Sequence, residues 1–306
     1  MKKILPLIML LCLLGCAKQS TTQPRTSGMQ ILTSLKATKL LTQTLTADTR
    51  IQTIQTVPST YSMNSQARYF KKHAREFNEQ AMGAAACVTI RSIWNRDDLY
   101  PYARRANVRI VEIDGSAPVD KTQAGVKLIK EKTGGNVSPF IWRSPGNLTK
   151  MADFIAKDLM ALYPDQAAVI DNNLKSLKQQ LFKLRTKYEL KFIDLESMDV
   201  ISLTGDFDYL ISEFGIEVVD SFLKQEIDWN DADVAALAQS IRENEIKTVL
   251  CNRMPQGKIF EAIVNNGAHP VVLTTLVTAN DPHLPPKQRL LEFYSENLER
   301  IYGGLE

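Results

Sequence analysis

Apolar residues recur at helical spacing in the middle of the chain, after Tyr163. They lie at Ala168, Val169, Leu174, Leu177, Leu181 and Leu184. Pro164 and Asp165 suit the first turn of such a helix, because proline needs no amide partner there and a carboxylate faces the positive end of the helix dipole. The pattern predicts one helix from Pro164 to about Tyr188, about 37 Å long at roughly 1.5 Å per residue.

Short apolar runs before this helix alternate with amphipathic segments, which predicts a first α/β half. Strands are expected at residues 29–35, 51–57, 87–90 and 107–113, and helices at residues 37–45 and 64–82. A β-α-β order of this kind indicates a parallel sheet with right-handed crossovers.

The chain after the long helix repeats the alternation. Strands are expected at residues 191–193, 200–203, 217–219, 248–251 and 270–274, and helices at residues 207–214, 231–243, 257–265 and 288–302. Asn230 or Asp231 can cap the second of these helices. The predicted fold is α/β, with two lobes at residues 29–162 and 190–306, each a mostly parallel sheet with flanking helices, joined by one long rigid helix at 163–189. Ligands of such folds bind outside the carboxyl ends of the strands.

The first residues have the pattern of an export signal. Lys2 and Lys3 precede an apolar run, residues 4–14, that is too short to span a bilayer. Leu13-Leu14-Gly15-Cys16 fits a lipobox, in which Cys16 receives diacylglycerol, although a plain signal peptide with an incidental cysteine would look similar. We expect residues 1–15 to be a signal peptide and residues 16–28, rich in Gln, Ser and Thr, to be a lipidated flexible tether. The exported protein would then be anchored to a membrane and face the periplasm or the cell exterior.

Length and charge narrow the class of protein. The 306 residues suit two domains, and the formal charge of +3 includes two lysines of the signal, so the exported chain is nearly neutral and no nucleic-acid partner is indicated. The sequence has no Gly-x-Ser-x-Gly, no glycine-rich phosphate loop and no His-Glu-x-x-His, which argues against an enzyme. Cys87 and Cys251 fall in strands of different lobes and are expected to be buried free thiols.

The middle of the chain carries a family resemblance. The run Pro139-x-Ile141-Trp142-x-Ser144-Pro145, the Tyr-Pro-Asp before the long helix, Phe207-x-Tyr209-Leu210 and residues 214–219 are similar to the zinc/manganese solute-binding lipoproteins of ABC importers, the cluster A-I or ZnuA/TroA-like family. The resemblance covers about residues 29–305. It implies a monomer that holds a small ligand in the cleft between its lobes and delivers it to an ABC permease and its ATPase. A rigid helix between the lobes implies a small closure set by loops.

The same resemblance places four metal-ligand positions on this chain. They fall on Ser59, Phe140, Thr204 and Thr274. Hydroxyls are poor ligands for Zn²⁺ or Mn²⁺ and a phenyl ring is none, so no metal ligand is assigned with confidence. A slip of a residue or two recruits Asp206 or Asp208 but no histidine, because His73, His269 and His283 are expected on an exposed helix face or in loops. No resident cofactor is indicated, and a divalent metal or a metal chelate stays possible as the transported ligand.

Arginines near the same loops suggest a different ligand. Arg91 follows a strand, Arg143 follows Ile-Trp, and Asn252-Arg253 stands where the family often has Glu-Pro. Guanidinium groups bind carboxylate or phosphate, so an anionic solute such as an organic acid or an acidic metal chelate is one interpretation. The other is that these arginines pair with Asp97, Asp98, Asp206 and Asp208 across loops. Trp94 and Trp142 line the cleft or belong to the core between the lobes.

Two functions are consistent with these patterns. The first is an extracytoplasmic solute-binding lipoprotein of an ABC importer with an altered cleft. The second is an accessory lipoprotein that kept the fold, lost ligand capture and serves as an interaction partner. The first predicts weak binding of bare Zn²⁺ and Mn²⁺.

Overall fold

The computed structural model describes residues 29–119, 123–132, 134–277 and 281–306. The predicted signal peptide at 1–15, the lipidated Cys16 and the tether at 16–28 lie outside the described residues. Within the described part of the chain, no helix has both the length and the apolar composition needed to cross a bilayer.

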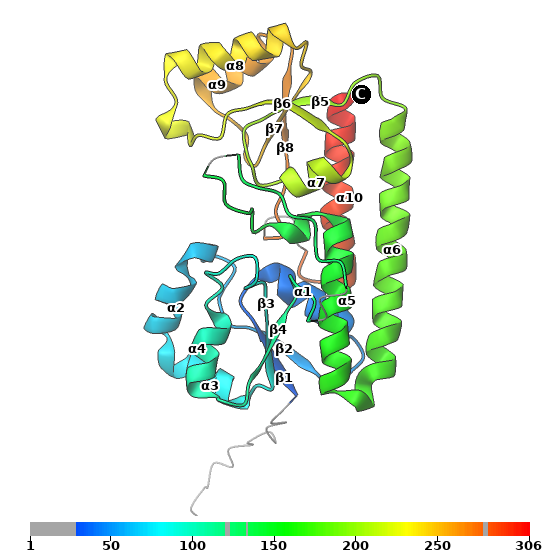
Figure 1. Ribbon diagram of the computed structural model, residues 1–306. Helices are drawn as coiled ribbons and strands as arrows, with labels where there is room; N and C mark the ends of the chain where they lie inside the picture. Colours follow the sequence, from blue (N-terminus) through cyan, green and yellow to red (C-terminus); the bar gives the residue numbers. More distant parts are fainter. Residues whose placement is uncertain (1–28, 120–122, 133, 278–280) are drawn as a thin grey trace, which may run out of the picture.

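Two four-stranded sheets form the framework, and all strand pairs in both are parallel, as predicted (Figure 1). The first sheet has the order β2-β1-β3-β4, with β1 (Gln30–Thr33), β2 (Gln52–Gln55), β3 (Ala86–Thr89) and β4 (Val111–Asp114). The second has the order β6-β5-β7-β8, with β5 (Asp199–Ser202), β6 (Glu217–Ser221), β7 (Thr248–Cys251) and β8 (His269–Val272). Each sheet places the carboxyl ends of its strands at one edge, where loops can hold a ligand.

Helices flank both sheets. The first lobe carries α1 (Lys36–Leu45), α2 (Gln66–Lys72), α3 (Ala74–Gly83), α4 (Leu99–Ala106) and α5 (Pro145–Leu162). The second carries α7 (Asp208–Glu213), α8 (Asp231–Glu243), α9 (Gly257–Val264) and α10 (Pro286–Leu305). Short 3₁₀ turns occupy η1 (Met63–Ser65), η2 (Ile141–Arg143), η3 (Pro164–Gln166) and η4 (Glu226–Asp228). Asn230 caps α8 in a reciprocal capping box with Asp233, which confirms one of the two predicted caps.

The predicted long helix between the lobes is present. It is α6 (Ala167–Ile193), which runs beside α5 and α10 along one side of the molecule (Figure 1). The predicted strand at 191–193 is wrong, because these residues form the last turn of α6. Phe192 continues the buried stripe of the helix, and the Lys191 ammonium binds Glu299 of α10 at 2.7 Å.

A second correction concerns the helix predicted at 64–82. It is divided into η1, α2 and α3, and α2 and α3 meet at His73, where no glycine or proline signals a break. The His73 ring stacks on Tyr69 with 4.4 Å between ring centroids. His73 is therefore half-buried rather than solvated on an exposed helix face, as its lysine neighbours had suggested.

One apolar cluster extends through both lobes. It runs from Ile31 and Val88 of the first sheet through α1, α5, α6 and α10 to Leu250 and Val271 of the second sheet. Helix α1 of the first lobe also packs directly against α10. Because separating the lobes would break this shared core, the loops around the cleft can move more easily than the lobes themselves.

Candidate solute-binding site

A cavity of about 190 Å³ lies where the two lobes meet the segment that precedes α5. The first lobe contributes the β1–α1 junction, the loop after β2 and the start of α2. The segment before α5 contributes Phe140, Trp142 and Arg143, and the second lobe contributes Thr275, Leu276 and Val277. We call this space the cleft cavity. Its place at the carboxyl ends of β1 and β2 is where the fold predicts a ligand.

The four positions indicated by the family resemblance are held in different ways. The Ser59 hydroxyl accepts a hydrogen bond from the Gln55 amide at 3.0 Å, and Ser59 and Phe140 both line the cleft cavity. The Thr274 backbone is held by Asn297 of α10, which accepts from its N–H at 2.8 Å and donates to its carbonyl at 2.9 Å. Thr204 does not line the cleft cavity; it borders a separate one in the second lobe.

Arg143 is the most constrained charged group of the cleft. Its guanidinium lies 4.1 Å from the Phe140 ring centroid and 4.6 Å from that of Phe207. It donates to the Asp206 carbonyl and lies 3.6 Å from the Asp206 carboxylate, while only 5% of the residue is exposed. Burial lowers the pKa of Arg143 to about 10, so the group stays charged at neutral pH. The cleft thus contains a fixed cation with its own counter-ion.

Asp206 and Asp208 adjoin this arginine on the second lobe. The Asp206 carboxylate also accepts a hydrogen bond from the Asn252 amide at 3.0 Å. Asp208 shares a small cavity with Glu131, Lys132 and Phe140. The pKa of Asp208 is raised to about 6, chiefly by burial and in part by Asp206 and Glu131, against the opposing effects of Lys132 and Arg143.

The titration of Asp208 gives a pH prediction. Its pKa in the folded protein lies above the unfolded value of 3.8, so its stabilising contribution is present at low pH and is lost as the pH rises through about 6. We expect urea unfolding to show a loss of about 1–2 kcal/mol between pH 4 and pH 7 that Asp208→Asn removes. Asp97 is fully buried, and burial raises its pKa to about 6. Its titration adds a second, independent decline in the free energy of unfolding over the same pH range, which Asp208→Asn leaves in place.

The control for this experiment is Asp165→Asn, at an exposed position in η3. It should leave the pH dependence of wild type unchanged. A D208N variant whose free energy of unfolding declines between pH 4 and pH 7 as steeply as that of wild type would contradict the assignment.

The other predicted cleft residues are not gathered in one place. Arg91 is exposed after β3, beyond the cleft cavity, and its charge acts on Glu112. Trp94 belongs to the apolar core and does not line the cleft cavity. Trp142 belongs to the same core and also lines the cavity. The structure therefore does not bring Arg91, Arg143 and Arg253 to one anion.

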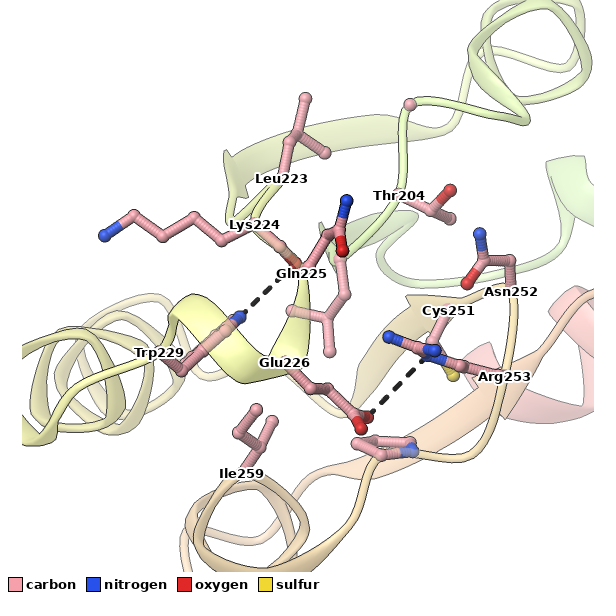
Figure 2. A pocket seen from close by; sticks show the side chains of 13 residues that line it. Thr204, Leu223, Lys224, Gln225, Glu226, Trp229, Cys251, Asn252, Arg253 and Ile259 are labelled. Carbon is pink, nitrogen blue, oxygen red and sulfur yellow. Dashed lines mark hydrogen bonds and ion pairs between the residues drawn. The ribbon is translucent and has the colours of Figure 1, made fainter.

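A second cavity, of about 540 Å³, lies wholly in the second lobe at the carboxyl ends of β5, β6 and β7 (Figure 2). Arg253 faces Glu226 across it at 4.0 Å, and the Trp229 indole donates to the Lys224 carbonyl at 3.4 Å (Figure 2). Thr204, Asn252 and the buried Cys251 border the same space. Because no residue of the first lobe contributes, a ligand here would not be held between the lobes.

The cleft residues do not suit a bare divalent metal. Among the residues that the structure describes, no three His, Cys, Asp or Glu side chains come together in a way that could hold a metal ion. Phe140 offers no donor atom, and the Ser59 hydroxyl already accepts a hydrogen bond. The Arg143 guanidinium in the cavity wall has only N–H donors to offer and is already paired with Asp206, so it supplies no ligand atom to a dication.

Sequence reasoning missed several polar residues of the cleft cavity, among them Gln66 and Lys36. Lys36 is the first residue of α1, a position that carries no motif. Gln66 falls inside the predicted helix 64–82, where a glutamine is expected on the solvent face. In the structure Gln66 shares the buried face of α2 with Tyr69 and Phe70, at i, i+3 and i+4 spacing, and this periodicity was the signal that could have found it.

Comparisons with known proteins agree with the fold. Residues 39–304 match the family described as zinc-uptake complex component A, periplasmic. A search of curated protein sequences gives no match. Solved structures include the metal-dependent lipoprotein YcdH from Bacillus subtilis, which is 17% identical over 90% of this chain and 99% of its own, with a TM-score of 0.72.

Two further structures have the same fold at low identity. The solute-binding protein FpvC from Pseudomonas aeruginosa, in complex with Ni²⁺, is 16% identical over 91% of this chain and 97% of its own, with a TM-score of 0.66. A periplasmic metal-binding protein from Candidatus Liberibacter asiaticus is 14% identical over 90% of this chain and 99% of its own, also with a TM-score of 0.66. At such identities the likeness concerns the fold alone.

Proposed function

Because this chain belongs to the family of the periplasmic component A of zinc-uptake complexes, we propose that it is the extracytoplasmic solute-binding lipoprotein of an ABC importer whose cleft takes a solute other than a bare metal ion. Members of the family are substrate-binding proteins rather than enzymes, and they work with an ABC permease and its ATPase. We place this protein outside the cytoplasmic membrane, held by a lipid on Cys16.

One observation supports the proposal that the cleft takes a solute other than a bare metal ion. The cleft cavity is bordered by residues of both lobes, as a solute-binding site requires, yet the position where the family has a histidine before Ile-Trp holds Phe140. The Phe140 ring covers the Arg143 guanidinium, which is already neutralised by Asp206. A space of about 190 Å³ is also far larger than one ion needs, because a water molecule occupies about 30 Å³ in the liquid.

Cross-linking in native membranes tests the role. The proposal expects that the wild-type chain, cross-linked in intact cells and identified by mass spectrometry, is joined to an ABC permease. Cys16→Ser serves as the control, because it should release the protein from the membrane fraction and abolish the cross-link. Cross-links to other lipoproteins without any permease would favour the accessory role instead, and Cys16→Ser protein that stays in the membrane would contradict the lipid anchor.

A further inference from the structure

Gln66 is a buried amide without a partner. Only 2% of the residue is exposed, and within the described chain neither its nitrogen nor its oxygen makes a hydrogen bond. Buried polar groups in folded proteins are nearly always paired, because an unpaired one loses its bonds to water without replacement. Gln66 lines the cleft cavity, and its amide atoms are covered in the empty cavity, so a small rotation of the side chain would let a molecule inside supply both a donor and an acceptor.

The amino end of α1 gives the same cavity a positive character. Ser34, Leu35, Lys36 and Ala37 form this part of the wall, and no side chain caps the helix. The first amides of a helix and its dipole favour an anion at this end. Lys36 adds an ammonium group that has no ion-pair partner among residues 29–119, 123–132, 134–277 and 281–306.

The charges around Lys36 are mostly positive. Burial lowers the pKa of Lys36, and Arg289 and Lys39 lower it further by repulsion. The nearby Asp97 carboxylate forms no ion pair with Lys36 among the described residues. It accepts hydrogen bonds from the Ser34 hydroxyl at 3.1 Å and from the Ile90 N–H at 3.0 Å. The charge of Asp281 acts on Arg289, so an anion bound beside Lys36 would chiefly offset the repulsion between Lys36 and Lys39.

The rest of the wall is largely apolar and includes the side chains of Tyr61, Phe140 and Trp142. A cavity of roughly 150 Å³ holds benzene, which has six non-hydrogen atoms, so about 190 Å³ suits a body of roughly eight. Aromatic walls favour a flat or branched apolar body over an extended polar one.

From the unpaired Gln66 amide, the Lys36 end of α1 and the apolar wall between them, we propose that the cleft cavity binds a small organic carboxylate with an apolar body and a second hydrogen-bonding group. The carboxylate lies at the amino end of α1 beside Lys36, and the second polar group pairs with Gln66. This inference rests on the proposed solute-binding role and names the class of solute.

Calorimetry with 4-hydroxybenzoate and 3-hydroxybenzoate, which carry the carboxylate and the second polar group at different positions of a flat apolar ring, tests the class, using the full chain with Cys16→Ser. We expect at least one of them to bind one-to-one with a Kd below about 100 µM. Gln66→Met, close in size but without the amide, should weaken binding about tenfold or more, and Lys36→Gln should do the same. Lys72→Gln is the matched control, at the exposed last residue of α2 and outside the cavity wall, and should weaken binding roughly threefold at most.

Thermal unfolding without solute supplies a readout that a structural role would not give. Gln66→Met should raise the melting temperature, because it removes an unpaired buried amide from an empty cavity. A lower melting temperature would mean that the amide is satisfied inside the fold, by ordered water for example, and would overturn the proposal. So would binding of neither probe, or binding that Gln66→Met and Lys36→Gln leave intact.

Mass spectrometry of small molecules released from the purified wild-type protein separates this inference from the function it rests on. A stoichiometric solute that is not a carboxylic acid would overturn the class and leave the solute-binding role standing. Absence of any released solute, together with no permease cross-link, would overturn both.

Discussion

Replacing Arg143 with alanine is expected to lower the free energy of unfolding by about 3 kcal/mol, as breaking a buried charge pair does. The substitution removes the contacts of the guanidinium with the rings of Phe140 and Phe207 and leaves the Asp206 carboxylate without its cation. It also empties a site where 95% of the arginine is shielded from solvent. Urea unfolding followed by circular dichroism measures the change.

Arg253→Ala provides the matched control. This arginine pairs with Glu226 at 4.0 Å, but its side chain is 64% exposed, so its removal should cost less than about 0.5 kcal/mol. If both variants lose the same small amount of stability, Arg143 is not the fixed cation of the cleft.

Zinc and manganese are expected to leave the stability of the protein unchanged. A tight metal site would add about 4 kcal/mol at a free metal concentration of 1,000 times Kd, because the ion binds the folded state alone. Ser59, Phe140, Thr204 and Thr274, the four positions to which the sequence resemblance assigns metal ligands, offer three hydroxyls and a phenyl ring, which are poor or no ligands for these ions. We therefore expect calorimetry to show no one-to-one binding tighter than about 10 µM.

Metal binding through the carboxylates of Asp206 and Asp208 in the second lobe would contradict this expectation. Stoichiometric, submicromolar zinc or manganese binding that disappears in Asp206→Ala would restore a metal site, shifted onto Asp206 and Asp208. The short distance between Asp206 and the Arg143 guanidinium, 3.6 Å, argues against it, because that carboxylate already has a counter-ion.

The architecture could be predicted because hydrophobic periodicity is a local property of the chain. The stripe of Leu174, Leu177 and Leu181 defines α6, and the short β-branched run at β7 defines a buried strand. The end of α6 could not be predicted, because Lys191-Phe192-Ile193 fits a strand as well as a helical turn. The packing of the buried Phe192 against Phe214 and Tyr302, which lie far along the chain, favours the helical turn.

The candidate site was less accessible to sequence reasoning. The family resemblance led to Ser59 and Phe140, which do line the cleft cavity, and to Arg143. It grouped Arg91 and Arg253 with them, although each follows a different strand and points to different surroundings. Gln66 carries no motif; its spacing from Tyr69 and Phe70 puts it on the buried face of α2, but a polar side chain on that face does not show that it borders a cavity. Polar residues whose role depends on tertiary placement are therefore the part that a single sequence leaves open.

Elemental analysis of the purified protein tests the altered cleft most directly. The full chain with Cys16→Ser would be purified without chelators, desalted, and its metal content measured by mass spectrometry against protein concentration. The account predicts far less than one zinc or manganese per chain, since the described cleft lacks the donors to retain either through desalting. One tightly held zinc or manganese per chain would contradict it.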